Sequence, residues 1–244
     1  MLPEVLAQQE RAWNARPLLR RVYEQWYDEL GRRLADVPGD TVELGSGIGR
    51  FKERFPFVVA TDVEPTVWAE QVVDAEALPY PGGSVANLVL IDVFHHLARP
   101  ARFLDVSTRV LAPGGRILIL DPYCSLLSTP LYRLFHDERT DLGGSAFGDE
   151  PGLASSPLAS NQARATLAFF REVQHFRERW PKLELVERRR FSFLVYPLSG
   201  GFSRRPLLPA ALYEPLAALE RRLGFLAPLA AFRCLVVLER AQSR

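Results

Sequence analysis

Residues 41–51 read TVELGSGIGRF, a short apolar run that passes into a glycine-rich turn and then into a charged segment. Gly45, Gly47 and Gly49 carry no side chains, so a ligand can approach the backbone and the start of a following helix. The order of strand, glycine loop and helix is typical of nucleotide-binding α/β proteins. The loop alone is a weak motif, because a glycine-rich turn can also serve packing.

Four apolar runs that end in an acidic residue follow the loop. They are FVVATD (57–62), QVVD (71–74), VANLVLID (85–92) and RILILD (116–121). Continuous apolar runs of this length predict strands buried on both faces, as in parallel sheets. Helical spacing lies between them and around them, at 17–34, 100–111, 126–139 and 161–180. We therefore expect an α/β protein with a doubly wound, mostly parallel sheet.

The chain divides into a core and additions within a single domain of residues 1–244. We expect an N-terminal helical cap at 1–37, a cofactor-binding core at 38–124, insertions at 125–182 and 194–230, and late strands at 183–193 and 231–240. Residues 141–160 are rich in glycine, serine, alanine and proline and predict a loop.

Composition disfavours several classes of function. The 30 basic and 29 acidic residues give a net charge of +1, so nucleic acid is not an expected partner. Cys124 and Cys234 have neither metal-ligand nor disulfide spacing. The N-terminus lacks the apolar stretch of a secretory signal. The apolar run 224–238, with Pro228 and Arg233 inside it, is shorter than the ~18 residues of a membrane span. We expect a cytoplasmic protein without a transmembrane segment.

Two acidic residues extend the glycine loop into a candidate nucleotide site. Asp62 ends the strand after the loop, where a carboxylate can accept both ribose hydroxyls. Asp74 can accept an adenine amino group while Ala75 packs against the ring. Either residue could instead be a solvated turn residue. Arg50 stands where a dinucleotide-binding loop would have glycine or alanine, which counts against a nicotinamide cofactor.

The joint order of these motifs resembles the class I S-adenosylmethionine-dependent methyltransferases, in particular their type 11-like small-molecule branch. The matching segments are VELGSGIGRF (42–51), ATD (60–62), DAEALPYPGGS (74–84), VLIDVFHHL (89–97) and LAPGGRILILDP (111–122). The resemblance implies a Rossmann-like methyltransferase fold with a seven-stranded sheet and helical lid insertions. It also implies S-adenosyl-L-methionine as cofactor. The implied cofactor residues are Glu43, Gly45, Ser46, Gly47, Gly49, Asp62, Asp74, Ala75, Ile91 and Asp92.

The expected reaction is direct displacement, because a sulfonium already activates its methyl group and the protein mainly aligns the acceptor. An oxygen acceptor needs a base, and His96 or His136 could serve, although a structural role is open for both. We expect a structural role for His95. Asp121 and Tyr123, at the exit of a strand, are candidate substrate-binding residues. Histidines and acids show no compact ligand motif such as HExxH, so metal-free transfer is expected.

The acceptor is expected to be a small molecule, and the insertions at 125–182 and 194–230, which form lids over the acceptor in related methyltransferases, are expected to hold the specificity for it. Residues 194–230 combine aromatic, aliphatic and arginine residues, which suits an apolar or lipid-linked acceptor but equally a packed helical hairpin. The segment IDVFHH lacks the motifs of DNA-base methyltransferases. Two alternatives stay open: a noncatalytic S-adenosylmethionine-binding or protein-interaction module, and a nicotinamide-dependent oxidoreductase.

Overall fold

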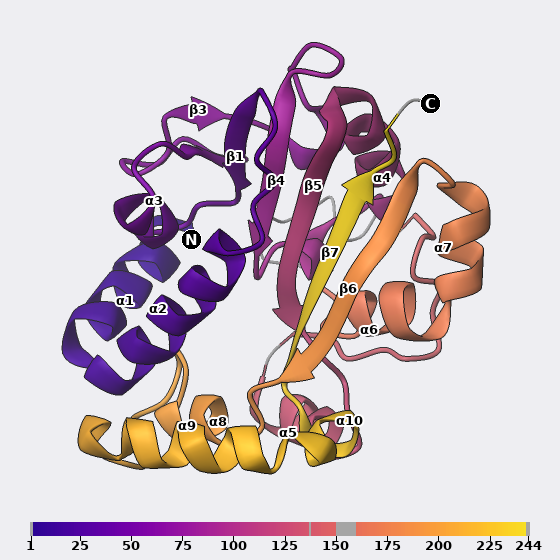
Figure 1. Ribbon diagram of the computed structural model, residues 1–244. Coiled ribbons are helices and arrows are strands. Elements are labelled where there is room, and N and C mark those ends of the chain that lie inside the picture. Colours follow the sequence, from indigo (N-terminus) through magenta and orange to yellow (C-terminus); the bar gives the residue numbers. More distant parts are fainter. Residues whose placement is uncertain (1, 137, 150–159, 243–244) are drawn as a thin grey trace.

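The protein folds around one seven-stranded sheet in the order β3-β2-β1-β4-β5-β7-β6 (Figure 1). The computed structural model describes residues 2–136, 138–149 and 160–242. The strands are β1 (Asp40–Leu44), β2 (Val59–Asp62), β3 (Gln71–Val72), β4 (Val85–Ile91), β5 (Leu111–Pro122), β6 (Leu183–Phe191) and β7 (Arg233–Arg240). Neighbours from β3 to β5 pair in parallel, whereas β7 is antiparallel to both β5 and β6. This confirms the predicted doubly wound, mostly parallel sheet.

Side-chain character sorts the strands into central and edge positions. In β4 every residue from Val85 to Leu90 is buried, as expected for a strand covered on both faces. The edge strand β6 reads LELVERRRF and is mostly half-buried or exposed. Its arginines and glutamates protect the open edge from pairing with another chain.

Helices cover both faces of the sheet. They are α1 (Leu2–Ala15), α2 (Pro17–Gly31), α3 (Arg50–Arg54), α4 (Pro100–Val110), α5 (Ser128–Phe135), α6 (Arg164–Thr166), α7 (Val173–Arg179), α8 (Val195–Ser199), α9 (Tyr213–Arg222) and α10 (Ala227–Ala230). Short 3₁₀ turns η1 (Ala75–Ala77), η2 (Phe94–His96), η5 (Ala210–Leu212) and η6 (Gly224–Leu226) connect them, together with a π-helical turn η4 (Leu167–Arg171). No helix among these is both long and apolar enough to cross a membrane.

The predicted helix over 161–180 is broken in the structure. Regular α-helix begins at Arg164, and the π turn interrupts it, with the Glu172 N–H bonded to the Leu167 carbonyl at 2.8 Å. Downstream of the π turn, Trp180 is buried and donates its indole N–H to Asp105 of α4 at 2.7 Å. Of the predicted loop 141–160, residues 141–149 contain neither helix nor strand, and 150–159 lie outside the described residues.

The segment between β6 and β7 forms a helical layer beyond the carboxyl ends of β5 and β6 (Figure 1). It contains α8, α9 and α10, and α5 lies beside it. The helix α2 contacts α8, so the N-terminal cap and this late segment meet beyond the carboxyl ends of the strands. Ligands of doubly wound sheets bind at the carboxyl ends of the strands, so a site is expected here.

Candidate active site

The glycine loop adopts a backbone that side chains would disturb. Gly45, Gly47 and Gly49 have φ values of 69°, 52° and 67°, in the left-handed region. A Cβ atom on Gly45 would lie 2.5 Å from the Val93 Cγ2 atom, and one on Gly49 would lie 3.0 Å from the Trp68 Cβ atom. The loop therefore needs glycine at both positions for conformation and space.

Three polar side chains surround this loop. The Gly47 N–H donates to Asp62 Oδ2 at 3.0 Å, which fixes the loop against the end of β2. Glu43 is buried, and burial together with the nearby Asp62 raises the pKa of Glu43 to about 8. Glu43 Oε2 and Ser46 Oγ are buried and have no hydrogen-bond partner within the described part of the chain. These two oxygens are therefore available to a polar ligand or to water.

The N-terminal cap lies directly over the loop. The atoms nearest to a Cβ built on Gly47 are Gln9 Oε1 at 3.8 Å and Leu6 Cδ2 at 4.0 Å, both from α1. Arg50 pairs with Glu10 at 3.5 Å, and its guanidinium lies 5.7 Å from the centre of the Trp13 ring. Arg50, which occupies the position of a small residue in dinucleotide-binding loops, thus joins α3 to α1.

The residues assigned to the adenine side have mixed environments. Asp74 lies two residues beyond β3 and accepts a 2.8 Å hydrogen bond from the Glu76 N–H, so it caps the 3₁₀ turn η1. Asp74 is exposed, and Ala75 and Ile91 are half-buried. These three side chains remain open to a ligand, although a capping role also explains Asp74.

Asp92 is held by Arg233 and Tyr23, which no sequence motif indicates as site residues. It has a φ of 57°, rare for a residue other than glycine and frequent at functional sites. Its carboxylate pairs with Arg233 and accepts the Tyr23 hydroxyl at 2.9 Å. Arg233 is buried, donates to the Tyr196 hydroxyl at 2.5 Å, and lies 5.2 Å from the centre of the Trp26 ring. In the sequence, the only sign of this role of Arg233 is its position at the start of an apolar strand.

A largely apolar cavity of about 620 Å³ adjoins this charged pair. Tyr132, Tyr196 and Phe232 line it, and Tyr196 and Phe232 lie beside Arg233 in space or sequence. Further lining residues are Leu131, Phe135, His136, Leu198, Phe202, Arg204, Arg205 and Leu207. The cavity lies between α5 and the segment around α8, within the two insertions in which acceptor specificity was expected.

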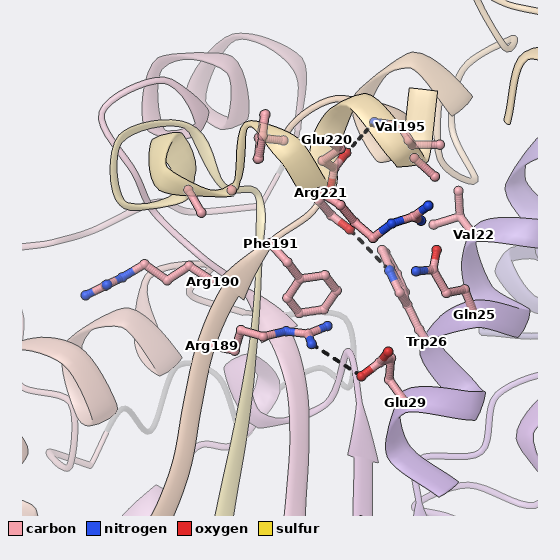
Figure 2. Close-up of a pocket in the computed structure, with 15 residues that line it drawn as sticks. Val22, Gln25, Trp26, Glu29, Arg189, Arg190, Phe191, Val195, Glu220 and Arg221 are labelled. Atoms are coloured by element: carbon pink, nitrogen blue, oxygen red, sulfur yellow. Dashed lines mark hydrogen bonds and ion pairs between the residues drawn. The ribbon is translucent and has the colours of Figure 1, made fainter. Parts of the chain in front are cut away.

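A second cavity, of about 360 Å³, lies between α2, β6 and α9 (Figure 2). Four of its charged side chains, Glu29, Arg189, Arg190 and Glu220, have protein partners. Arg189 pairs with Glu29 at 3.3 Å, and Glu220 accepts the backbone N–H groups of Leu194 and Val195 at the start of α8. These contacts are sufficient to explain the residues as structural.

The candidate histidines separate into two groups. His136 is exposed at the end of α5 and lines the 620 Å³ cavity. His96 instead lies with Glu138, at 4.0 Å between Nε2 and Oε1. His95, for which a structural role was expected, is buried and bonded through Nδ1 to Asp121 at 2.9 Å. Burial would lower the pKa of His95, but Asp121 and Glu138 outweigh it and raise the pKa.

The candidate substrate residues Asp121 and Tyr123 do not line the cavity. Asp121 is fully buried against His95, and the Tyr123 hydroxyl accepts a 2.9 Å hydrogen bond from Arg190 of β6. Both side chains are held by protein partners, and their role as substrate ligands stays a prediction. Sequence position placed both residues at the correct end of β5 but not their side-chain directions.

Part of the chain matches a known protein domain, and the fold is similar to that of several solved structures. Residues 42–119 match the model of a methyltransferase domain. No curated protein sequence matches the chain. Among solved structures, a SAM-dependent methyltransferase from Archaeoglobus fulgidus is similar, with a TM-score of 0.52 and 11% identity over 89% of this chain and 94% of that one.

Two further structures have the same fold. Geranyl diphosphate C-methyltransferase from Streptomyces coelicolor A3(2), solved with Mg²⁺, geranyl diphosphate and S-adenosyl-L-homocysteine, gives a TM-score of 0.51 and 11% identity over 91% of this chain and 80% of that one. A putative methyltransferase, solved in complex with the Haloferax volcanii methyltransferase activator Trm112, gives a TM-score of 0.50 and 18% identity over 96% of this chain and 97% of that one. Residues 42–119 thus match a methyltransferase domain, and the seven-stranded sheet that contains them has the Rossmann-like methyltransferase fold.

Proposed function

We propose that the protein transfers a methyl group from S-adenosyl-L-methionine to a small, largely apolar acceptor that carries a polar or anionic group. The observation that carries this proposal is that two candidate binding regions lie at the carboxyl ends of the strands. One is the glycine loop with its unpartnered buried oxygens, and the other is the apolar cavity beside Asp92 and Arg233.

The residues around the glycine loop fit the cofactor. Glu43 and Ser46 offer buried polar atoms to the amino-acid part, and Asp62 offers a carboxylate to the ribose hydroxyls. Gly47 permits close approach to the backbone, whereas Gly45 and Gly49 keep the loop in its conformation against Val93 and Trp68. Asp74, Ala75, Ile91 and Asp92 complete the proposed adenine and sulfonium side. When bound, S-adenosyl-L-methionine supplies a methyl group activated by its sulfonium.

The walls of the cavity suit the acceptor. Its volume lies within the usual range for small-molecule sites, and its aromatic and leucine side chains would exclude water from the transfer. His136 offers an imidazole that can bind a hydroxyl or amine of the acceptor. Arg204 and Arg205 are exposed members of the cavity wall and would attract a carboxylate or phosphate. The geranyl diphosphate of one structural neighbour has this apolar and anionic character.

The two alternatives make different predictions. A noncatalytic module would bind the adenosyl ligands without methyl transfer to any acceptor. A nicotinamide oxidoreductase would prefer NAD, but Arg50 pairs with α1 in the place where the dinucleotide motif requires a small residue. The match of residues 42–119 to a methyltransferase domain also favours the methyl donor.

The test is calorimetric titration of the purified protein with S-adenosylmethionine and S-adenosylhomocysteine, with NAD as the comparison ligand. Saturable 1:1 binding of the adenosyl ligands is expected, and Asp62→Ala should weaken it at least about tenfold because a buried charged hydrogen-bond partner is lost. Asp36→Ala, at an exposed acid outside the site, is the matched control. Apolar carboxylates and phosphates are then screened with donor labelled in the methyl group.

Failure has two distinct forms. Absence of adenosyl binding by folded protein, or preference for NAD, would overturn the cofactor assignment. Tight cofactor binding without labelled product across the acceptor set would favour the noncatalytic module instead.

A further inference from the structure

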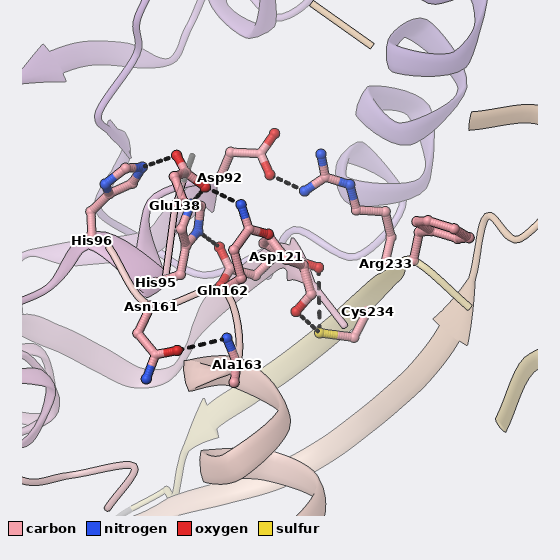
Figure 3. A network of polar contacts seen from close by, with 12 residues as sticks. Asp92, His95, His96, Asp121, Glu138, Asn161, Gln162, Ala163, Arg233 and Cys234 are labelled. Atoms are coloured by element: carbon pink, nitrogen blue, oxygen red, sulfur yellow. Dashed lines mark hydrogen bonds and ion pairs between the residues drawn. The ribbon is translucent and has the colours of Figure 1, made fainter. Parts of the chain in front are cut away.

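Two histidines and a glutamate form a compact cluster near the carboxyl ends of β4 and β5. His95 and His96 belong to η2, and Glu138 follows α5 (Figure 3). Glu138 Oε2 lies 3.8 Å from His95 Nε2, and Glu138 Oε1 lies 4.0 Å from His96 Nε2. One potential ligand atom from each of the three residues lies within 4.8 Å of the other two. The cluster joins residues far apart in the sequence, so no local motif indicated it.

A fourth residue orients the cluster. Asp121 is fully buried, and its Oδ1 lies 2.9 Å from His95 Nδ1. A carboxylate at Nδ1 favours the tautomer with the proton on that atom, which directs the lone pair of Nε2 toward Glu138. Carboxylates hold metal-binding histidines in the same way in many proteins. The arrangement of Asp121, His95 and Glu138 is therefore suited to a cation beside Nε2.

The loop that carries Glu138 is fixed to its surroundings. Gln162 donates from its side-chain amide to Glu138 Oε2. The next residue, Arg139, forms an isolated bridge with Asn161, and the Asn161 N–H donates to the His95 carbonyl at 2.9 Å. The segments that contribute the three side chains are thus connected by backbone hydrogen bonds, which limits the rearrangement that ion binding would require.

We propose that His95, His96 and Glu138 bind one divalent first-row transition-metal ion. Two imidazole nitrogens and one carboxylate oxygen suit Zn²⁺, Co²⁺, Mn²⁺ or Fe²⁺ better than Mg²⁺, which prefers oxygen ligands. Ligands at ~2.1 Å from such an ion are separated by roughly 3.0–3.5 Å. The separations of 3.8 and 4.0 Å, and the 4.8 Å within which all three ligand atoms lie, therefore need a closure of roughly 0.5–1.5 Å through side-chain rotation.

The ion would lie near the acceptor cavity. Glu138 lies two residues after His136, which lines that cavity. Three protein ligands leave coordination positions open, so the ion could bind an oxygen of the acceptor. This consequence depends on the proposed methyl transfer, whereas the metal site itself does not.

The test uses Co²⁺, whose visible absorption reports coordination, together with calorimetric titration of Zn²⁺ and Mg²⁺. We expect one equivalent of Co²⁺ and of Zn²⁺ to bind, with Mg²⁺ at least about tenfold weaker. His96→Ala and Glu138→Ala should each lower Co²⁺ affinity at least about tenfold. Both side chains are partly exposed, at 25% and 31%, so these variants should fold, which far-UV circular dichroism checks.

Two further variants separate the site from nonspecific binding. Asp121→Asn should weaken Co²⁺ binding by about 10- to 100-fold without removing a ligand, as expected for a residue that orients one. His175→Ala is the matched control, because His175 also lies 3.8 Å from a glutamate, Glu172, but outside the cluster. No Co²⁺ binding, or binding that survives both His96→Ala and Glu138→Ala, would overturn the proposal whatever the result with S-adenosylmethionine.

Discussion

Arg233, the first residue of β7, forms an ion pair with Asp92, which directly follows β4. The pair connects two strands on opposite sides of β5, and the Tyr23 hydroxyl connects α2 to the same carboxylate. Arg233 is 5% exposed, and nearby Asp92 and tyrosine groups raise its pKa above the ordinary value despite burial. A permanent buried cation therefore organises the proposed acceptor side of the site.

Removal of this cation should destabilise the protein. Arg233→Met keeps much of the volume but leaves the Asp92 carboxylate without its main partner, and we expect a loss of about 3 kcal/mol in the free energy of unfolding. The double variant with Asp92→Asn should recover part of this loss, since asparagine tolerates the positive φ. Urea denaturation of the two single variants and the double variant measures the coupling. Additive effects would contradict the role given to the pair.

Glu43 should make the stability of the ligand-free protein fall as pH rises. Its folded-state pKa is about 8, against an ordinary value of 4.5, so the folded state holds the proton more tightly than the unfolded state. Stability from this group is complete below pH ~4.5 and is lost as pH rises through ~8, with a slope of at most ~1.4 kcal/mol per pH unit.

Urea denaturation at pH 5, 6, 7 and 8 tests this expectation. Glu43→Gln should reduce the loss of stability across this range, because its amide cannot ionise. Glu53→Gln, at an exposed carboxyl in the helix after the same loop, should follow the wild type. If the difference between wild type and Glu43→Gln is constant with pH, the raised pKa is wrong.

Both cysteine thiols should be unreactive in the folded protein. Burial raises the pKa of Cys124 to about 12 and that of Cys234 above its ordinary value, so almost no thiolate is present at pH 8. A chromogenic disulfide reagent should label no thiol in native protein and two in denaturant. Ser203→Cys, at an exposed position, should add one rapidly labelled thiol. Fast labelling of wild-type protein would show that one of these regions opens readily.

The sequence predicted the strands more reliably than the site geometry. Runs such as VANLVLID contain the information locally, because a strand buried on both faces must be apolar along its length. The glycine loop is equally local, since its positive φ values select the residue type directly. Helix limits were less accurate where tertiary contacts decide, as at the π turn before Glu172.

The charged groups of the site were harder to predict because their partners are distant in the sequence. Arg233 and Asp92 are 141 positions apart, and only the sheet order brings them together. His95 was assigned a structural role, yet its contacts with Asp121 and Glu138 give it a defined orientation and a raised pKa. Side-chain direction at a strand end is equally hard to predict, as the contacts of Asp121 with His95 and of Tyr123 with Arg190 illustrate.

The 620 Å³ cavity should bind apolar anions, and a bulky side chain in its wall should prevent this. We expect Leu131→Trp, at a half-buried lining residue of α5, to weaken binding of anilinonaphthalene sulfonate at least about fivefold by filling the cavity. Binding of S-adenosylhomocysteine should be unchanged, because Leu131 is not among the residues assigned to the cofactor. Leu219→Trp, on an exposed position of α9 outside the cavity, is the matched control. Equal dye binding by both variants and the wild type would mean that the dye occupies another surface and that this cavity is not the acceptor site.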